Sequence, residues 1–209
     1  MTTAAWILLA IAALFAVGNW VAVARGSTLL MYVCKPATLV FLIAVAVAVD
    51  PVHGDERTWF VIALVLSLLG DIFLMLPQDR FVFGLASFLL GHIAYTVGLN
   101  LHTDGLWLLA IPVVIIAALL AVRLVRGIRT SGQAELLGPV IAYVVVIAAM
   151  GASAVASGNA VAAVGALLFM ASDSLIGETR FVQPRAWGGV AIMVTYHLGQ
   201  AGLVLSLVT

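Results

Sequence analysis

Long, uninterrupted apolar runs fill most of this sequence, and they limit the possible folds more than any other feature. A helix needs about 20 consecutive apolar residues to cross the hydrocarbon core of a bilayer. By this measure the sequence predicts an all-α polytopic membrane protein, a bundle of eight transmembrane helices in a single domain over residues 1–209. The predicted helices are Ala4–Ala24, Leu29–Val49, Thr58–Leu76, Phe81–Leu101, Leu106–Val122, Leu136–Ala156, Asn159–Ile176 and Trp187–Val208.

The composition excludes several other classes of protein. Only 9% of the residues are charged, whereas soluble domains contain about 25%. The apolar runs are continuous, whereas the strands of a membrane barrel alternate apolar and polar residues over about 10 positions. The formal net charge is zero and Cys34 is the single cysteine. The sequence therefore predicts neither nucleic-acid binding nor an intrachain disulfide.

The positions of the arginines predict the orientation of the bundle. The loops after odd-numbered segments contain seven arginines, whereas those after even-numbered segments contain only Arg57. Positively charged loops stay in the cytoplasm, so both termini are expected outside. The chain is thus expected to be a multi-pass protein of a bacterial plasma membrane. The seven arginines are Arg25, Arg80, Arg123, Arg126, Arg129, Arg180 and Arg185.

Two predicted helices each carry one buried aspartate, and a histidine follows in the next helix. His92 follows Asp71, and His197 follows Asp173. A charged side chain at the bilayer centre costs about 2.5–3.5 kcal/mol on insertion scales, so it usually faces a bundle interior or a wet cavity and functions there. Both aspartates are expected about 8–9 Å inside the cytoplasmic ends of their helices, with the histidines deeper. Paired carboxylates in a dry site cannot both ionise easily, so one can act as a general acid.

Each of these residues also has a structural interpretation. The aspartates could cap their helices or pair with a nearby arginine such as Arg80 or Arg180. Lys35 could extend to the inner headgroups, with Pro36 beginning its helix, or it could bind a phosphate or an aspartate. The histidines could be bonded to backbone carbonyls of the core.

Polar residues near the histidines favour a polar cavity. Tyr95 lies three residues after His92. Tyr196 and Gln200 are four residues apart. These spacings place each pair on nearly the same face of a helix.

The order of aspartate, loop and histidine occurs twice, which suggests a duplicated four-helix unit in parallel orientation. Arg-Phe-Val follows both aspartates, at Arg80–Val82 and Arg180–Val182. The similarity is short, and the spacing from aspartate to arginine is nine residues in one copy and seven in the other. Duplication and coincidence both remain open at this point.

Short motifs in this order carry a family resemblance. They are Lys35-Pro36, Ser67–Asp71 (SLLGD), Phe83-Gly84, Gly91-His92 with Tyr95, Gly165–Asp173 (GALLFMASD), and Tyr196 with Gln200. From about Lys35 to the C-terminus, the sequence resembles the YhhN-like family of membrane proteins, which includes the lysoplasmalogenases. One position departs from the family pattern, which has a second tyrosine after Tyr196 where this chain has His197.

The resemblance implies an enzyme that hydrolyses the vinyl ether bond of lysoplasmalogen, a lysophospholipid, to a fatty aldehyde and a glycerophospho-base. Such a reaction needs an acid to protonate the β-carbon and a carboxylate to stabilise the resulting cation and orient water. Asp71 and Asp173 are the candidate catalytic residues, in either order, and no cofactor or metal ion is expected. The substrate would come from the inner leaflet. Lys35 is the candidate phosphate ligand, and the candidate cleft residues are His92, Tyr95, Tyr196, His197 and Gln200.

Two other functions remain open for the same residues. A proton-coupled transporter or exporter could relay protons along buried aspartates and histidines, although no charge is expected in the outer half of the membrane. A metal-dependent lipid hydrolase could use Asp71, Asp173, His92 and His197 as ligands. Against it, the aspartates are expected several ångströms shallower than the histidines. The sequence contains none of the common motifs of soluble hydrolases or nucleotide-binding proteins.

Overall fold

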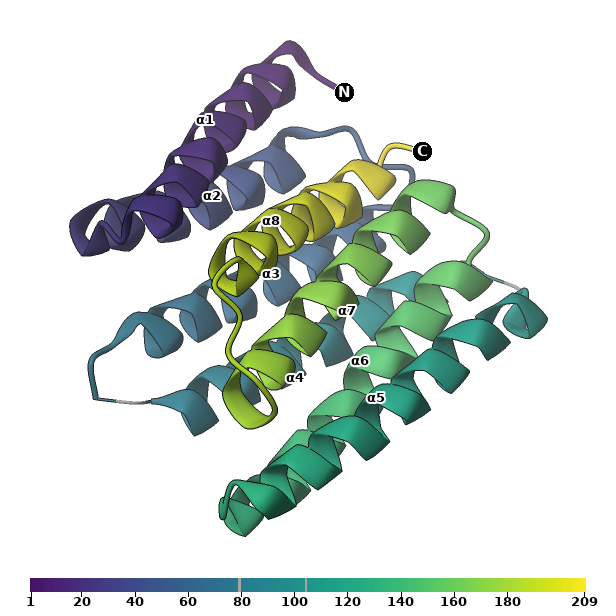
Figure 1. Cartoon of the computed structure of the whole chain (residues 1–209). Helices are drawn as coiled ribbons and strands as arrows, with labels where there is room; N and C mark the ends of the chain where they lie inside the picture. Colours follow the sequence, from purple (N-terminus) through teal and green to yellow (C-terminus); the bar gives the residue numbers. More distant parts are fainter. Residues whose placement is uncertain (79, 104) are drawn as a thin grey trace.

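The fold is helical throughout the described part of the chain. The structure is a computed structural model that describes residues 1–78, 80–103 and 105–209. Figure 1 shows its α-helices as tilted rods that run side by side. They are α1 (Thr3–Arg25), α2 (Thr28–Ala48), α3 (Gly54–Met75), α4 (Phe81–Asn100), α5 (Ile111–Thr130), α6 (Leu137–Ala156), α7 (Ala160–Phe181) and α8 (Gly188–Ser206). The short 3₁₀-helices η1 (Trp107–Ala110) and η2 (Ala134–Leu136) precede α5 and α6.

The predicted class, a polytopic membrane protein, is confirmed. Within the described residues, eight helical segments are long and apolar enough to cross a membrane. Their outer surfaces carry large apolar side chains that are mostly exposed, such as Leu14, Leu108 and Leu119. Soluble monomers rarely expose such a surface, whereas lipid covers it at no cost.

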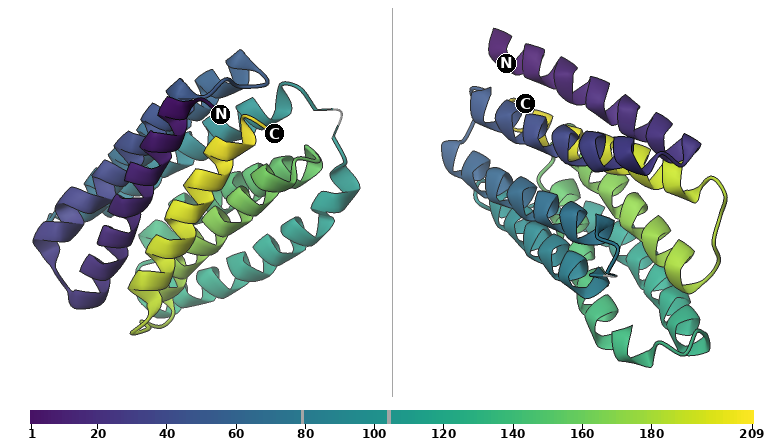
Figure 2. Two further views of the ribbon diagram at one scale, coloured as in Figure 1. Left: turned by 90° about the horizontal axis from the view of Figure 1, so that it is seen from above. Right: turned by 90° about the vertical axis from the view of Figure 1, so that its left-hand side faces the viewer.

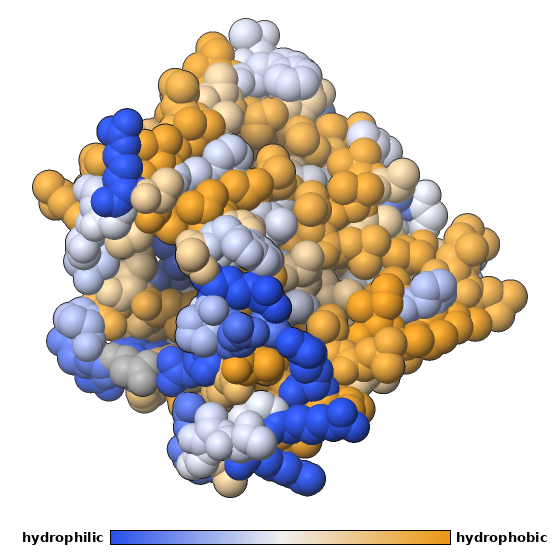
Figure 3. All heavy atoms as spheres, viewed as in Figure 1, coloured by the Kyte–Doolittle hydropathy of each residue, from blue (hydrophilic) through white to orange (hydrophobic). Residues whose placement is uncertain are grey.

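The connections place the seven arginines together. The two termini lie at one end of the bundle, and the α1–α2, α3–α4, α5–α6 and α7–α8 connections lie at the other (Figures 1 and 2). We call the latter the arginine-rich end. In Figure 3 hydrophilic residues gather toward the lower left, over several of these connections, and apolar residues cover most of the remaining face. This separation is what the positive-inside assignment requires.

Two helices extend further toward the arginine-rich end than predicted. The helix α5 ends at Thr130 instead of Val122, and α7 ends at Phe181 instead of Ile176. The sequence predicts that both helices end near their first charged residues. In the structure both helices continue past that point, and charged residues of the added turns pair with each other. Arg123 of α5 donates hydrogen bonds of 2.7 and 2.5 Å to the carboxylate of Glu178 of α7.

The helix contacts recur in the two halves of the chain. The pairs α1–α2, α2–α3 and α3–α4 pack together, as do α5–α6, α6–α7 and α7–α8. The contact of α4 with α6 likewise has a counterpart in that of α8 with α2. A parallel four-helix duplication predicts these correspondences. Against it, the contacts α1–α8, α5–α7 and α3–α8 have no counterpart among the described residues. Duplication stays a prediction.

Glycines bring α7 and α8 into backbone contact. A Cβ atom built on Gly199 would lie 2.7 Å from the backbone nitrogen of Phe169, and one on Gly165 would lie 2.7 Å from that of Leu203. Backbone atoms cannot move aside as the end of a flexible side chain can. Small residues at this interface therefore allow the close packing that holds membrane helices together.

We expect Gly199→Ala to lower the free energy of unfolding by about 1–3 kcal/mol, the usual cost of overpacking a close interface. The measurement is the midpoint of thermal unfolding in detergent. Gly138→Ala is the matched control, since a Cβ atom there meets nothing within 4 Å. Equal midpoints for the two variants would contradict the packing argument.

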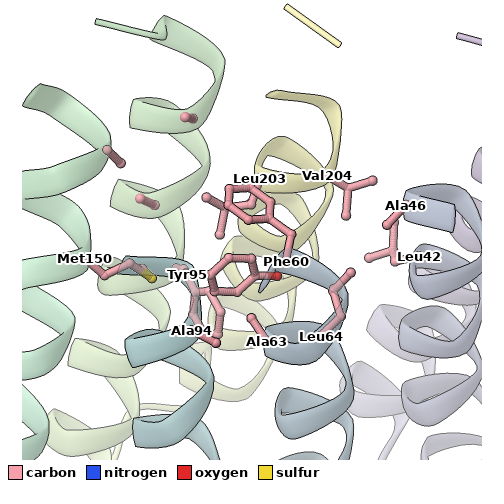
Figure 4. Close-up of a cluster of buried hydrophobic side chains, with 14 of the residues drawn as sticks. Leu42, Ala46, Phe60, Ala63, Leu64, Ala94, Tyr95, Met150, Leu203 and Val204 are labelled. Atoms are coloured by element: carbon pink, nitrogen blue, oxygen red, sulfur yellow. The ribbon is translucent and has the colours of Figure 1, made fainter. Parts of the chain in front are cut away.

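The main apolar core continues from this interface toward α3 and α4. Phe60, Leu64 and Leu203 are fully buried there. Figure 4 shows Tyr95 among these side chains, with its hydroxyl group directed toward α8. A phenol buried in such a core needs a partner for its hydroxyl group, and that partner belongs to the polar site.

Candidate active site

Asp71 is the centre of a buried polar group formed by α2, α3 and α8. Its Oδ1 atom lies 3.0 Å from Lys35 Nζ, and its Oδ2 atom accepts a 2.8 Å hydrogen bond from the Tyr196 hydroxyl. The side chains of Asp71 and Lys35 are only 1% and 11% exposed. Lys35 was considered as a ligand of a phosphate or as the counter-ion of an aspartate, and this geometry matches the counter-ion.

Asp173 is the centre of a second group, formed by α4, α6 and α7. Its Oδ2 atom accepts a hydrogen bond from the Tyr143 hydroxyl and lies 3.4 Å from His92 Nε2. The contact with His92 has the distance of an ion pair but not the geometry of a hydrogen bond. Asp173 thus meets a phenol and an imidazole, whereas Asp71 meets an ammonium group.

The predicted depths are wrong for this second group. His92 and Asp173 meet at one level, although the histidine was expected several ångströms deeper. Asp173 lies eight residues before the end of α7, whereas Asp71 lies four before the end of α3. At 1.5 Å per residue these separations are about 12 Å and about 6 Å. The unpredicted last turns of α7 account for the difference.

The tautomer of His92 follows from its backbone contact. Its Nδ1 atom lies 2.5 Å from the carbonyl oxygen of Phe88. A carbonyl oxygen only accepts, so Nδ1 carries a hydrogen and Nε2 of the neutral ring is an acceptor. This acceptor faces the carboxyl group of Asp173. The approach of this acceptor favours a protonated Asp173 carboxyl group, and we call the two side chains the Asp173–His92 pair.

Two phenylalanines stand between the carboxyl groups. The Phe169 ring centroid lies 4.6 Å from that of His92 and 5.2 Å from that of Tyr196. Phe88 packs edge-on against both Phe169 and Tyr196. Asp71 and Asp173 are close enough to interact electrostatically, but the structure places them in separate hydrogen-bonded groups.

The remaining predicted residues join these groups only partly. Tyr95 donates a 2.6 Å hydrogen bond to Gln200 Oε1, and Gln200 lies one helical turn from Tyr196. His197, at the position that departs from the family pattern, accepts a 3.0 Å hydrogen bond from Trp20 Nε1. It therefore holds α1 against α8 and is not part of either carboxylate group.

A small apolar pocket, with a cavity volume of about 60 Å³, opens beside Asp173. It lies between α3, α4, α5, α6 and α7 on the side of the arginine-rich end, and only Tyr143, Asp173 and Ser174 are polar among its lining residues. This volume is below the range of about 300–1,000 Å³ usual for small-molecule sites, so the pocket holds only part of a hydrocarbon chain. Asp71 does not line this pocket.

Sequence reasoning missed two residues of the site, Tyr143 and Phe88. Tyr143 is a polar residue within the largely apolar run of α6. A polar residue in such a run can be recognised in the sequence as a candidate site residue. Phe88 gives no signal, because a phenylalanine in a membrane helix is most often a packing residue. The described residues contain no group of three or more histidine, cysteine or acidic side chains that could hold a metal ion.

The comparison with protein families matches residues 30–207 to the YhhN family. The chain belongs to the YhhN family. The match begins after α1, so Trp20, the partner of His197, lies outside the matched segment. The helices, the buried carboxylates and this match together describe a multi-pass integral membrane protein of the YhhN family.

Curated YhhN relatives include proteins named as enzymes. "Lysoplasmalogenase" of Mycobacterium bovis is 38% identical over 155 residues, which are 70% of this chain and 58% of that relative. "Lysoplasmalogenase TMEM86B" of Homo sapiens is 34% identical over 146 residues, 69% of this chain and 61% of that relative. The matched part of this chain therefore spans about three fifths of the length of each. "Uncharacterized membrane protein YhhN" of Escherichia coli O157:H7 is 32% identical over 99 residues, 46% of this chain and 47% of that relative. No solved structure matches the chain.

Proposed function

We propose that this YhhN-family protein hydrolyses the vinyl ether bond of a lysoplasmalogen, releasing a fatty aldehyde and a glycerophospho-base. The relatives named lysoplasmalogenase support this reaction. The structural observation that carries it is the position of Asp173, a carboxyl group that lies 3.4 Å from His92 Nε2 and opens to an apolar pocket. A proton donor beside a site for a hydrocarbon chain is what the reaction needs. The transporter alternative is not favoured.

Asp173 is the acid in this proposal. The reacting end of the alkenyl chain lies in the pocket, and Asp173 transfers its proton to the β-carbon of the vinyl ether. The electron pair of the double bond forms the new C–H bond, and the ether oxygen shares the positive charge of the resulting oxocarbenium ion. Water then adds to the cationic carbon and returns one proton to the Asp173–His92 pair. The hemiacetal collapses as its hydroxyl proton moves to the departing glycerol oxygen.

Asp71 supplies a fixed negative charge on the other side of the two phenylalanines. Its ion pair with Lys35 and its hydrogen bond from Tyr196 hold the carboxylate in one position. Such a preorganised charge stabilises a cation that forms during the reaction. This proposal assigns the acid to Asp173, a choice that the sequence left open.

The substrate enters from the leaflet at the arginine-rich end. The pocket lies on that side of the bundle, and Arg123 and Arg126 of α5 line an open groove there. Arginines at this level can bind a lipid phosphate through two parallel hydrogen bonds. Lys35 is engaged with Asp71 and Arg123 with Glu178, so Arg126 replaces Lys35 as the candidate phosphate ligand.

The test of the function is aldehyde release by the purified protein in detergent. The substrate is an alkenyl lysophosphatidylethanolamine, and the controls are its saturated ether and its ester analogues. We expect aldehyde from the alkenyl lipid alone, because only a vinyl ether accepts a proton on carbon. A folded protein that releases no aldehyde from it would refute the proposal.

We expect Tyr143→Phe to lower the turnover number about 10- to 100-fold. The substitution removes a hydrogen bond to a group that ionises during the reaction, and such bonds contribute about 1.5–3 kcal/mol. The KM should change little, because the apolar lining of the pocket is kept. Tyr32→Phe is the control, since that exposed hydroxyl bonds only the carbonyl of Met75. An unchanged turnover number in Tyr143→Phe would contradict the role of Asp173 as the acid.

A further inference from the structure

Besides His92 Nε2, two polar atoms buried near the carboxyl groups have no hydrogen-bond partner among the described residues. They are Ser67 Oγ and Gln200 Nε2. The two residues are 1% and 0% exposed. A buried polar atom left without a partner costs about 1–3 kcal/mol. Native proteins usually satisfy such atoms with ordered water.

Both atoms lie next to the Asp71 group. Ser67 lies one helical turn before Asp71 on α3, and Gln200 lies one turn after Tyr196 on α8. Residues four apart share a helix face. The two atoms are therefore on the side of the Asp71–Tyr196 hydrogen bond that is away from the arginine-rich end.

The same atoms also adjoin the Asp173 group. Gln200 Oε1 accepts the hydrogen bond of Tyr95, and Tyr95 lies three residues after His92 on α4. A Cβ atom on Gly91, the neighbour of His92, would lie 3.3 Å from Ser67 Oγ. Ser67 of α3 and Gln200 of α8 thus both adjoin α4 within four residues of His92, the partner of Asp173.

Hydrolysis in this place needs a source of water. The pocket beside Asp173 is apolar apart from three residues, and once a hydrocarbon chain fills it, little water remains there. The polar atoms around Ser67 and Gln200 offer another place where the water needed for hydrolysis can bind. Gln200 also interacts with the Tyr196 hydroxyl, but its Nε2 atom completes no hydrogen bond.

We propose that Ser67 Oγ and Gln200 Nε2 bind an internal water molecule that attacks the oxocarbenium ion. This inference rests on the proposed function. The water oxygen forms the new bond to the cationic carbon, and one of its protons passes to the Asp173–His92 pair. The amide of Gln200 donates to the water oxygen, and the Ser67 hydroxyl either donates or accepts.

Further unpartnered atoms belong to α1 and α8. Both amide atoms of Asn19 and the Nε2 atom of His197 are buried without a partner among the described residues. Asn19 is 0% and His197 is 2% exposed. Ordered water is the usual partner of such atoms as well.

The first test detects the water itself. Hydroxyl radicals produced by X-ray radiolysis of bound water label adjacent side chains, and mass spectrometry locates the label. We expect labelling of Tyr95 and Tyr196 well above that of Phe60, which is equally buried in the apolar core. The double substitution Ser67→Ala with Gln200→Leu should reduce it several-fold. Labelling of both tyrosines no higher than that of Phe60 would overturn the inference.

The second test follows the fate of the cation. In a water–methanol mixture, methanol competes for the oxocarbenium ion and gives a mixed acetal in place of the aldehyde. We expect Ser67→Ala and Gln200→Leu, singly and together, to raise the ratio of acetal to aldehyde several-fold. Ser87→Ala, outside both carboxylate groups, is the control. An unchanged ratio of acetal to aldehyde in all three variants would overturn the inference. A wild-type protein that forms neither product would refute the proposed function instead. In that case the labelling experiment alone decides whether the water is present.

Discussion

Replacement of Asp173 by asparagine is expected to lower the rate of aldehyde release by about 100- to 10,000-fold, the usual contribution of a positioned general acid. Asparagine keeps the shape of the side chain and still accepts the hydrogen bond from Tyr143. It has no acidic proton to transfer to carbon, so the first step fails while the fold is kept. The turnover number in detergent, with a saturating alkenyl lysolipid, is the quantity to measure.

Asp50→Asn is the matched control for Asp173→Asn. Asp50 is exposed in the connection between α2 and α3, at the end of the bundle opposite the arginines. Its substitution should leave turnover unchanged. If Asp173→Asn unfolds at the wild-type midpoint and keeps its turnover within threefold, another group must supply the proton.

Loss of Lys35 is expected to have the largest effect on stability. Lys35→Met should lower the free energy of unfolding by about 3–5 kcal/mol, because removal of one partner of a buried ion pair leaves the other charge unpaired. Asp71 is 1% exposed and keeps only the hydrogen bond from Tyr196. Thermal or denaturant unfolding in a defined detergent gives the comparison.

A double substitution separates the ion pair from packing. Lys35→Met with Asp71→Leu removes both charges, and replacement of a buried pair by apolar residues is often neutral or stabilising. We therefore expect most of the lost stability to return, while aldehyde release stays low because the fixed negative charge is gone. If the double variant is as unstable as Lys35→Met alone, the loss comes from packing and not from an unpaired carboxylate.

The candidate residues show where sequence reasoning reached its limit. Asp71, Asp173 and His92 were singled out because an ionisable residue in an apolar helix is costly, a fact visible in the sequence alone. Of their partners, only Lys35 was considered, as one of several open roles for that residue. Tyr196 lies 125 residues from the aspartate that it bonds, and no spacing rule connects residues on helices that far apart in the chain. The depth of Asp173 was also wrong, since it depended on where α7 ends.

By itself the sequence determined the class of fold, the number of membrane-spanning helices and the end at which the arginines gather. These properties depend on local hydrophobicity and on the charge of short loops, which act on each segment independently of the others. Only the tertiary structure decided that Lys35 pairs with Asp71, that His92 and Tyr143 meet Asp173, and that the apolar pocket opens on Asp173. The reason is physical. The lateral packing of the helices sets which side chains meet, and packing depends on close contacts such as those of Gly165 and Gly199, not on the apolar pattern that makes each helix.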